Sequence, residues 1–148
     1  MDEYQIWSNM NSGLISNAIY FAGIAFLLWV AFRAANQMRA EDAGVFNKTL
    51  VSLFSLGIIF NGLFTGAIAF QILEGTAYSL SQLESMSAFS QAFVDAYGAT
   101  PPEAGMNVFT ANPINTGWWL VITVMIFGRI WTKACLLYTS DAADDWFC

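Results

Sequence analysis

Residues 50–73 read LVSLFSLGIIFNGLFTGAIAFQIL, and the architecture of the chain follows from this stretch. It contains no Asp, Glu, Lys or Arg, and only small or neutral polar residues interrupt its apolar ones. A helix of this length crosses the roughly 30 Å hydrocarbon core of a bilayer with residues to spare, which allows it to tilt. We therefore predict a transmembrane helix over residues 50–73.

Apolar stretches also lie before and after this helix, over residues 14–32 and 117–132. The strongly apolar residues of the first favour insertion by about 3–6 kcal/mol in total. We do not interpret it as a secretory signal peptide, because the chain opens with Asp2 and Glu3 instead of positive charge. The last stretch is short for a span, so a buried core helix or a re-entrant segment is the alternative there. The sequence predicts an all-α integral membrane protein with three transmembrane helices.

The composition also indicates a membrane protein. Of the 148 residues, 57% are hydrophobic and 11% are charged, and the mean hydropathy is +0.52. Soluble domains are nearer to about 25% charged, so a lipid bilayer must solvate much of this chain. The net charge of −6 excludes nucleic acid as a partner, because neutralising phosphates requires clustered cations. The length suits one membrane domain, over residues 1–134.

All Lys and Arg residues lie at the same ends of the apolar stretches. They are Arg33, Arg39, Lys48, Arg129 and Lys133. Short loops rich in these residues stay in the cytoplasm. We therefore expect residues 33–49 in the cytoplasm, and the N-terminus and residues 74–116 outside. The expected location is the cytoplasmic (inner) membrane of a bacterium.

The C-terminal residues 135–148 do not resemble native sequence. Residues 135–144 read CLLYTSDAAD, which resembles the translation of a transposase-type sequencing adapter, TGT CTC TTA TAC ACA TCT GAC GCT GCC GAC. A genuine acidic tail is the alternative. We expect a truncated metagenomic sequence whose natural chain continues differently after about Ala134. Both cysteines, Cys135 and Cys148, lie in this stretch, so they carry no information on disulfides or redox compartment.

The expected outer segment divides into a helix and a loop. Apolar residues recur at steps of three and four over residues 78–97, which predicts an amphipathic helix ending near Gly98. Residues 98–116 are rich in Pro, Gly, Asn and Thr and are expected to form a loop. The helix has no Lys or Arg to attract anionic lipid, so we expect it to pack on the protein's own spans or on a partner.

Small residues recur at helical spacing in the first two spans. They are Ala18, Ala22 and Ala25 in the first, and Ser55, Gly62, Gly66 and Ala69 in the second. If the spans run antiparallel, Ala25 lies level with Gly62, and Ala22 with Gly66. Small residues let two membrane helices approach closely, so we predict that these residues form the interface of this helical hairpin. A chance alignment and self-association through Gly62 and Gly66 are the alternatives.

Polar and aromatic residues in the spans have more local predicted roles. Asn61 lies near the middle of the bilayer, where an amide needs a partner, and interhelical hydrogen bonds in membranes contribute about 0.6 kcal/mol on average. It is expected to bond a neighbouring helix or a backbone carbonyl, and a polar site between spans is the alternative. Indole rings and a snorkelling guanidinium are expected to anchor the spans at the interfaces. These anchors are Trp7, Trp29, Trp118, Trp119 and Arg129.

No residues with a catalytic, cofactor-binding or metal-binding pattern are found in the sequence. The chain has no histidine, which removes the commonest metal ligand and the usual general base. The outer carboxylates lack metal-ligand spacing and are expected to be solvated. They are Glu74, Glu84, Asp95 and Glu103. The central part of each span carries no charge, which argues against a proton relay.

Two functional classes remain. The first is a small non-catalytic subunit or accessory protein of a membrane complex, with the lipid bilayer and a membrane protein as partners. The second is a homo-oligomeric transporter, channel-like or sensory membrane protein packed through Gly62 and Gly66. A membrane enzyme that uses only Asp, Glu, Ser or Tyr comes third.

Overall fold

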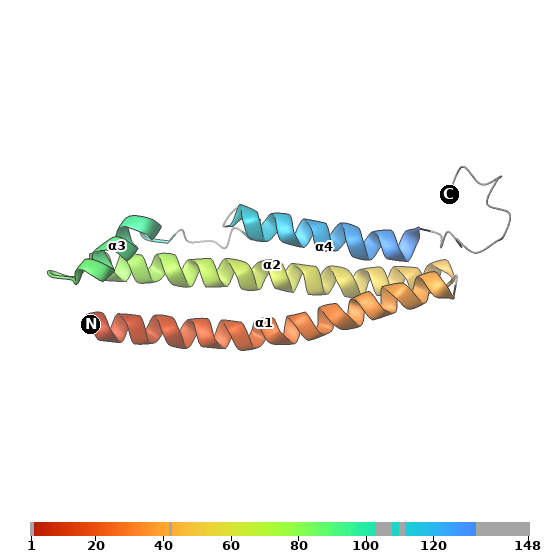
Figure 1. Cartoon of the computed structure of the whole chain (residues 1–148), viewed down its shortest axis with the longest axis horizontal. Helices are drawn as coiled ribbons and strands as arrows, with labels where there is room; N and C mark the ends of the chain where they lie inside the picture. The colour runs from red at the N-terminus through yellow and green to blue at the C-terminus, as the bar shows by residue number, and fades with distance from the viewer. Residues whose placement is uncertain (1, 42, 103–107, 110–111, 133–148) are drawn as a thin grey trace, which may run out of the picture.

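The computed structural model of the chain is all-α (Figure 1). It describes residues 2–41, 43–102, 108–109 and 112–132. The described helices are α1 (Glu3–Ala40), α2 (Val45–Ser81), α3 (Ala88–Tyr97) and α4 (Pro113–Trp131). The predicted fold class is confirmed, because three of these helices are long and apolar enough to cross a membrane and the fourth is short.

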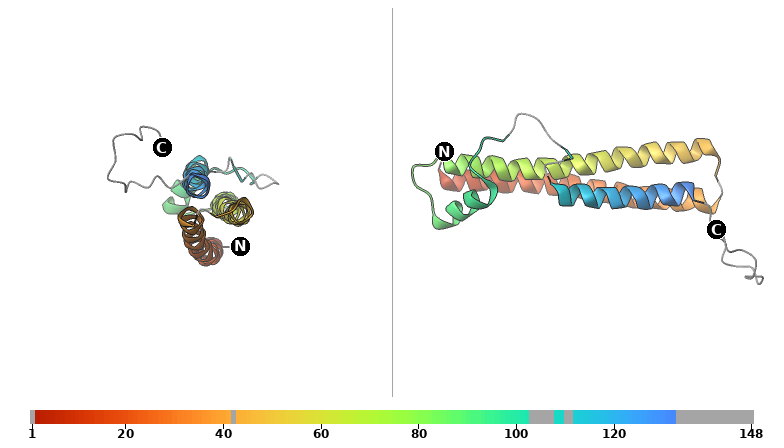
Figure 2. Two further views of the ribbon diagram at one scale, coloured as in Figure 1. Left: turned by 90° about the vertical axis from the view of Figure 1, so that its right-hand side faces the viewer. Right: turned by 90° about the horizontal axis from the view of Figure 1, so that it is seen from above.

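The three long helices form a bundle that is triangular in cross-section (Figure 2). α1 and α2 run antiparallel along their whole length, and α4 packs against both of them. α4 covers the half of the bundle that ends at the α1–α2 connection, and α3 packs on α2 at the opposite end. Because α1 and α2 each cross the bundle lengthwise, the N-terminus and α3 share one end.

Local capping explains where several helices begin. The Asp2 carboxylate accepts the backbone N–H of Gln5 at 2.8 Å, and the Gln5 side chain accepts the N–H of Asp2, which forms a capping box for α1. At α4, the Asn112 side chain accepts the N–H groups of the second and third helical residues, and Pro113 occupies the first position. These contacts satisfy N–H groups that would otherwise lack partners.

α1 and α2 extend well beyond the predicted spans. They contain 38 and 37 residues, or roughly 57 and 56 Å at 1.5 Å per residue, against roughly 30 Å of hydrocarbon. Most of the predicted loop 33–49 is therefore helical. The reason is that an apolar stretch marks only the part of a helix that can lie in hydrocarbon. The helix itself continues through polar residues as long as none of them breaks it, and α1 ends at Ala40, before Gly44. α4 begins at Pro113, slightly before the predicted span 117–132.

The helix expected over residues 78–97 is divided in the structure. α2 continues to Ser81, and α3 starts after Ser87, whose hydroxyl accepts the N–H of Ser90 at 3.2 Å. This N-cap begins a new helix instead of extending α2. Part of the predicted apolar stripe is nevertheless buried in one cluster, while Phe89 and Tyr97 are exposed. This cluster contains Ile6, Leu80 and Val94, with Trp7, Leu83, Met86 and Phe93 packed against it.

The larger core lies where the three long helices meet. It is formed by aliphatic side chains and one indole: Ile24, Ala31, Ala35, Ile58, Ile59, Leu63, Trp119, Ile122, Ile126 and Ile130. Residues 135–148, which resemble an adapter translation, lie outside the described residues, as do Lys133 and Glu103.

Candidate functional site

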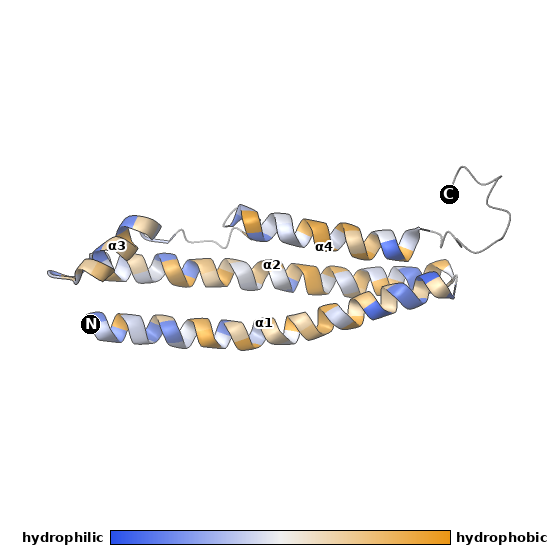
Figure 3. Cartoon of the chain, in the orientation of Figure 1, coloured by the Kyte–Doolittle hydropathy of each residue, from blue (hydrophilic) through white to orange (hydrophobic). Residues whose placement is uncertain are grey.

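The outer surface of the bundle is strongly apolar. The three long helices meet the length and composition expected of membrane spans, and large apolar side chains remain exposed on all of them. Figure 3 shows that polar residues gather at the first turns of α1 and around the α1–α2 connection. Such a surface implies contact with a lipid bilayer, because leaving it exposed to water would cost about 25 cal/mol for each Å² of apolar area.

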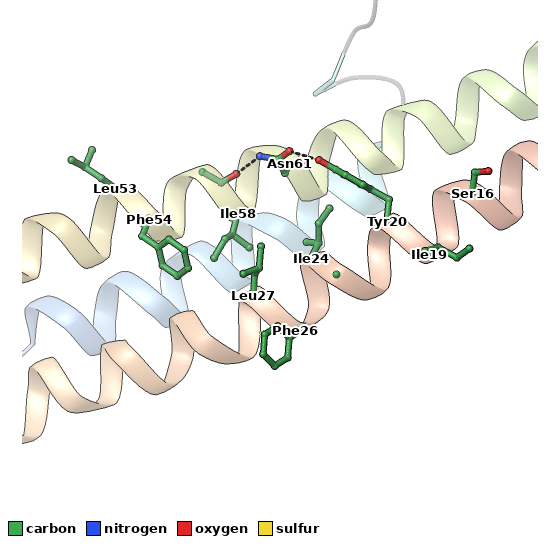
Figure 4. A pocket seen from close by; sticks show the side chains of 12 residues that line it. Ser16, Ile19, Tyr20, Ile24, Phe26, Leu27, Leu53, Phe54, Ile58 and Asn61 are labelled. Atoms are coloured by element: carbon green, nitrogen blue, oxygen red, sulfur yellow. Dashed lines mark hydrogen bonds between the residues drawn. The ribbon is translucent and has the colours of Figure 1, made fainter.

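A groove of about 870 Å³ runs between α1 and α2 (Figure 4). Its lining is mostly aliphatic and aromatic, and all of its residues come from these two helices. They are Ser16, Ile19, Tyr20, Gly23, Ile24, Phe26, Leu27, Leu53, Phe54, Gly57, Ile58 and Asn61. The volume lies within the range of about 300–1,000 Å³ that is typical of binding pockets. This groove is the candidate functional site.

One polar pair interrupts the apolar wall of the groove. The Tyr20 hydroxyl donates to Oδ1 of Asn61 at 3.0 Å, and Nδ2 of Asn61 donates to the carbonyl oxygen of Gly57 at 2.8 Å (Figure 4). Asn61 therefore has both a partner on the neighbouring helix and a partner on its own backbone. Tyr20 is 53% exposed, and its hydroxyl and the second N–H of Asn61 retain further hydrogen-bonding capacity.

The polar pair also borders a second, smaller groove toward the N-terminal end of α1. This groove of about 310 Å³ shares Ser16, Tyr20 and Asn61 with the first and adds Asn17. Hydrogen-bonding side chains thus form a short polar strip on an otherwise apolar surface. The sequence drew attention to Asn61 but not to Tyr20. A phenol inside an apolar stretch was the available signal, and its pairing with Asn61 depends on the register of the two helices.

Two glycines of the groove have open space where a side chain would stand. A Cβ atom added at Gly23 or at Gly57 would have no neighbour within 4 Å. Backbone is therefore accessible on both walls of the groove, which is the surface that close helix–helix packing uses in membranes.

Gly62 and Gly66 lie elsewhere, against α4. A Cβ at Gly62 would come within 1.9 Å of the Trp119 ring, and one at Gly66 within 2.3 Å of the Asn115 amide. The structure thus differs from the predicted pairing with Ala25 and Ala22. The physical reason is space: because Gly62 and Gly66 have no side chain, they leave room for Trp119 and Asn115 of α4.

The other predicted packing residues are divided between surface and interior. Ala18, Ala22 and Ala25 are exposed, and Ala69 is half-buried. Ser55 is fully buried, and its hydroxyl donates to the carbonyl oxygen of Val51. The small residues that α1 does bury are different ones. They are Ala31, at the end of the predicted span 14–32, and Ala35, in the part of α1 that was expected to be a loop.

The predicted interface anchors also differ in their exposure. Trp118 is 64% exposed, whereas Trp119 is only 2% exposed and its Nε1 has no hydrogen-bond partner among the described residues. Trp29 is exposed, with the Arg33 guanidinium 5.9 Å from its ring centroid. Trp119 is therefore placed in the core, because the space above Gly62 admits its ring.

The remaining two anchors join helices through hydrogen bonds. Nε1 of Trp7 donates to Oγ of Ser90 at 3.1 Å, and the ring packs edge-on against Phe93. Nη1 of Arg129 donates to Oδ1 of Asn36 at 2.7 Å. One bond links α1 to α3, and the other links α4 to α1.

A cluster of hydrogen bonds around the Glu3 carboxylate joins the start of α1 to α3. Glu3 accepts the hydroxyls of Ser87 and Ser90, each at 2.5 Å, and the backbone N–H of Ser87 at 3.1 Å. The hydrogen bond from the Ser87 hydroxyl, followed by that from Ser90, lowers the pKa of Glu3 below its ordinary value of 4.5. This cluster and the aromatic contacts of Trp7 fix α3 on the bundle.

The apolar lining and the polar pair of the groove suit an apolar occupant that can form one or two hydrogen bonds. Within residues 2–41, 43–102, 108–109 and 112–132, no three His, Cys, Asp or Glu side chains are grouped to hold a metal ion. No protein-family model, curated protein or solved structure matches the chain.

Proposed function

We propose that this chain is a non-catalytic subunit of a membrane complex and binds a transmembrane helix of its partner in the α1–α2 groove. The observation that carries the proposal is the Tyr20–Asn61 pair, which is exposed inside an apolar groove that faces the bilayer. The proposed unit is the membrane domain over residues 1–134.

Hydrogen-bonding groups at this depth favour a protein occupant over lipid tails. Polar side chains within spans normally face other helices, because hydrocarbon offers no hydrogen-bond partner. The free N–H of Asn61 and the hydroxyl of Tyr20 would bond a polar side chain of the partner helix. Gly23 and Gly57 would let that helix approach the α1 and α2 backbones closely.

We further propose that the N-terminus and residues 74–116 lie outside a bacterial cytoplasmic membrane and residues 33–49 inside. The Arg129–Asn36 hydrogen bond supports this orientation, because it holds the cationic end of α4 beside that of α1. Cations gathered at one end of a helical bundle are typical of the cytoplasmic side.

The alternative function, a homo-oligomer packed through Gly62 and Gly66, has less support. Both glycines are covered by α4 side chains of the same chain. A second copy would have to displace Trp119 and Asn115 to reach them.

Site-specific photocrosslinking in native membranes tests the proposed partner. A photoreactive amino acid replaces Leu53 in the groove or, as a control, Val124, an exposed residue of α4. The position in the groove is expected to yield one adduct of defined mass, which mass spectrometry identifies as a different membrane protein. The control position is expected to yield only lipid adducts.

A matched pair of glycine variants makes the test specific to the groove. Gly57→Leu fills the groove and is expected to abolish the adduct. Gly128→Leu on α4 adds the same side chain at a site with no neighbour within 4 Å and is expected to preserve it. Lipid adducts alone from Leu53 would contradict the proposal, and an adduct with a second copy of the chain would support the homo-oligomer instead.

A further inference from the structure

Three residues of α1 form a stripe at the end of the bundle that carries the α1–α2 connection. Trp29, Arg33 and Asn36 are spaced by four and three residues, so they lie on one face of the helix. The Arg33 guanidinium lies over the exposed Trp29 ring, with Cζ 5.9 Å from the centroid. The Trp29 ring therefore helps to hold the Arg33 side chain along the helix surface.

α4 adds a second guanidinium to this stripe. Nη1 of Arg129 donates to Oδ1 of Asn36 at 2.7 Å. An arginine has five N–H donors, so most of those on Arg129 remain available after this bond. Because Arg129 bonds Asn36, three residues from Arg33 on the same face of α1, both arginines belong to this stripe.

The position of this pair corresponds to the surface of a bilayer. Arg33 follows the last apolar residues of the first predicted span, and Arg129 lies in the last turn of α4. Trp131 is half-exposed at the same end, and its Nε1 donates to Oγ of Ser52 at 3.1 Å. Indole rings prefer the headgroup level of a membrane, where lipid phosphates lie.

We propose that Arg33 and Arg129 together bind the phosphate of an anionic phospholipid, with Asn36 positioning Arg129. The proposal rests on the membrane placement given under the proposed function. A guanidinium offers paired N–H donors that match two phosphate oxygens. A headgroup without its own cation is preferred, because a choline ammonium would be repelled by the pair.

Lipid titration of the purified full-length chain in mild detergent tests the site, with native mass spectrometry as the readout. The probes are phosphatidylglycerol, phosphatidylcholine and inorganic phosphate. The chain is expected to retain phosphatidylglycerol in preference to phosphatidylcholine. Replacing Arg33 or Arg129 by Gln is expected to lower phosphatidylglycerol occupancy about fivefold each. Lys48→Gln removes the same charge from the same end of the bundle and is expected to change occupancy less than twofold.

A second variant separates loss of the site from loss of the fold. Asn36→Asp gives Arg129 a carboxylate within the chain, so the bundle is expected to melt no lower than wild type while phosphatidylglycerol occupancy falls. Equal effects of Lys48→Gln and Arg129→Gln, or competition by inorganic phosphate at equal concentration, would overturn the lipid site.

The same experiment distinguishes this inference from the proposed function. A chain that requires detergent but binds both phospholipids equally would overturn the phosphate site alone. A chain recovered as a monomer without detergent would overturn the membrane placement and the site together.

Discussion

At Gly62, the absence of a side chain lets the Trp119 indole lie directly on the α2 backbone. The ring is almost completely buried, and its N–H has no hydrogen-bond partner among the described residues. An unsatisfied buried donor costs about 1–3 kcal/mol. The packing of the ring against Gly62 and the surrounding isoleucines must offset that cost, so this contact is central to the α2–α4 interface.

A methyl group at Gly62 is therefore expected to destabilise the bundle. In Gly62→Ala the new Cβ would lie within 1.9 Å of the ring, and overpacking of this kind costs about 1–3 kcal/mol. Thermal unfolding in detergent measures the effect. Gly57→Ala is the control, because its Cβ meets nothing within 4 Å, and it is expected to be neutral or stabilising by up to about 1 kcal/mol. Equal stability of the two variants would exclude the close contact.

Glu3 is expected to make the docking of α3 depend on pH. Hydrogen bonds from Ser87 and Ser90 lower its pKa below 4.5, so its stabilising contribution is complete above that value. It is lost as the pH falls through the lower pKa of the folded protein. A bimane probe on Ala92→Cys is used to report docking, in a chain with Cys135 and Cys148 replaced by Ser. Ala92 is exposed and precedes Phe93, whose ring packs on Trp7, so we expect Trp7 to quench the probe when α3 is bound.

The expected outcome is that bimane emission rises on acidification in the wild-type background. In Glu3→Gln the emission is expected to be high already at neutral pH and to change little. Glu84→Gln serves as a control carboxyl between α2 and α3, outside this cluster. The assigned role of Glu3 would be refuted by Glu3→Gln following the wild-type curve.

The sequence indicated which glycines permit close packing but not which helix they contact. Gly62 and Gly66 are recognisable from their spacing in an apolar stretch. A glycine has no side chain whose direction could favour one neighbour over another, so α1 and α4 were both compatible with the pattern. The deciding information is the bulk of Trp119 and Asn115, which fill those spaces only once α4 is docked.

The helices show why hydropathy predicts spans better than it predicts helix ends. The spans over residues 14–32 and 50–73 lie inside helices that run on for several turns. Residues 33–40 contain no Gly or Pro, so nothing in their backbone ends α1 where the apolar residues end. The continuation brings Ala35 and Asn36 into contact with the rest of the bundle, which a loop would not do.

Hydrogen exchange distinguishes a helical extension from a loop. Peptides covering residues 34–40 are expected to exchange slowly, because their amides are hydrogen-bonded within α1. Ala35 is also buried in the core, and Asn36 bonds Arg129 of α4. The amides of Ala99 and Thr100, which lie beyond the C-cap of α3, are expected to exchange within seconds and serve as the internal control. Complete exchange of residues 34–40 on that timescale would contradict the long helix.

For α3, the apolar pattern predicted which residues are buried together but not that the helix is interrupted. The apolar steps over residues 78–97 placed Leu80, Leu83 and Val94 on one face of a single helix. The structure buries them together in one cluster but ends α2 at Ser81 and begins α3 after Ser87. Serine at that position competes as an N-cap, and the contact of Glu3 with Ser87 comes from a segment distant in sequence.

In the molecule as a whole, the hairpin of α1 and α2 provides the frame, and α4 and α3 pack on different halves of it. Composition and hydropathy were sufficient to predict three long apolar helices and one short one. The α1–α2 groove was not predictable, because it depends on the register of the two helices, which brings Tyr20 beside Asn61.

The central claim is that a bilayer surrounds the three long helices and leaves their cationic ends on one side. Single cysteines at Lys48 and Glu84, in a chain with Cys135 and Cys148 replaced by Ser, test it by labelling intact cells with a membrane-impermeant maleimide. We predict that the probe labels position 84 in intact cells and labels position 48 only after the membrane is opened. Labelling of both positions in the same compartment would contradict the account.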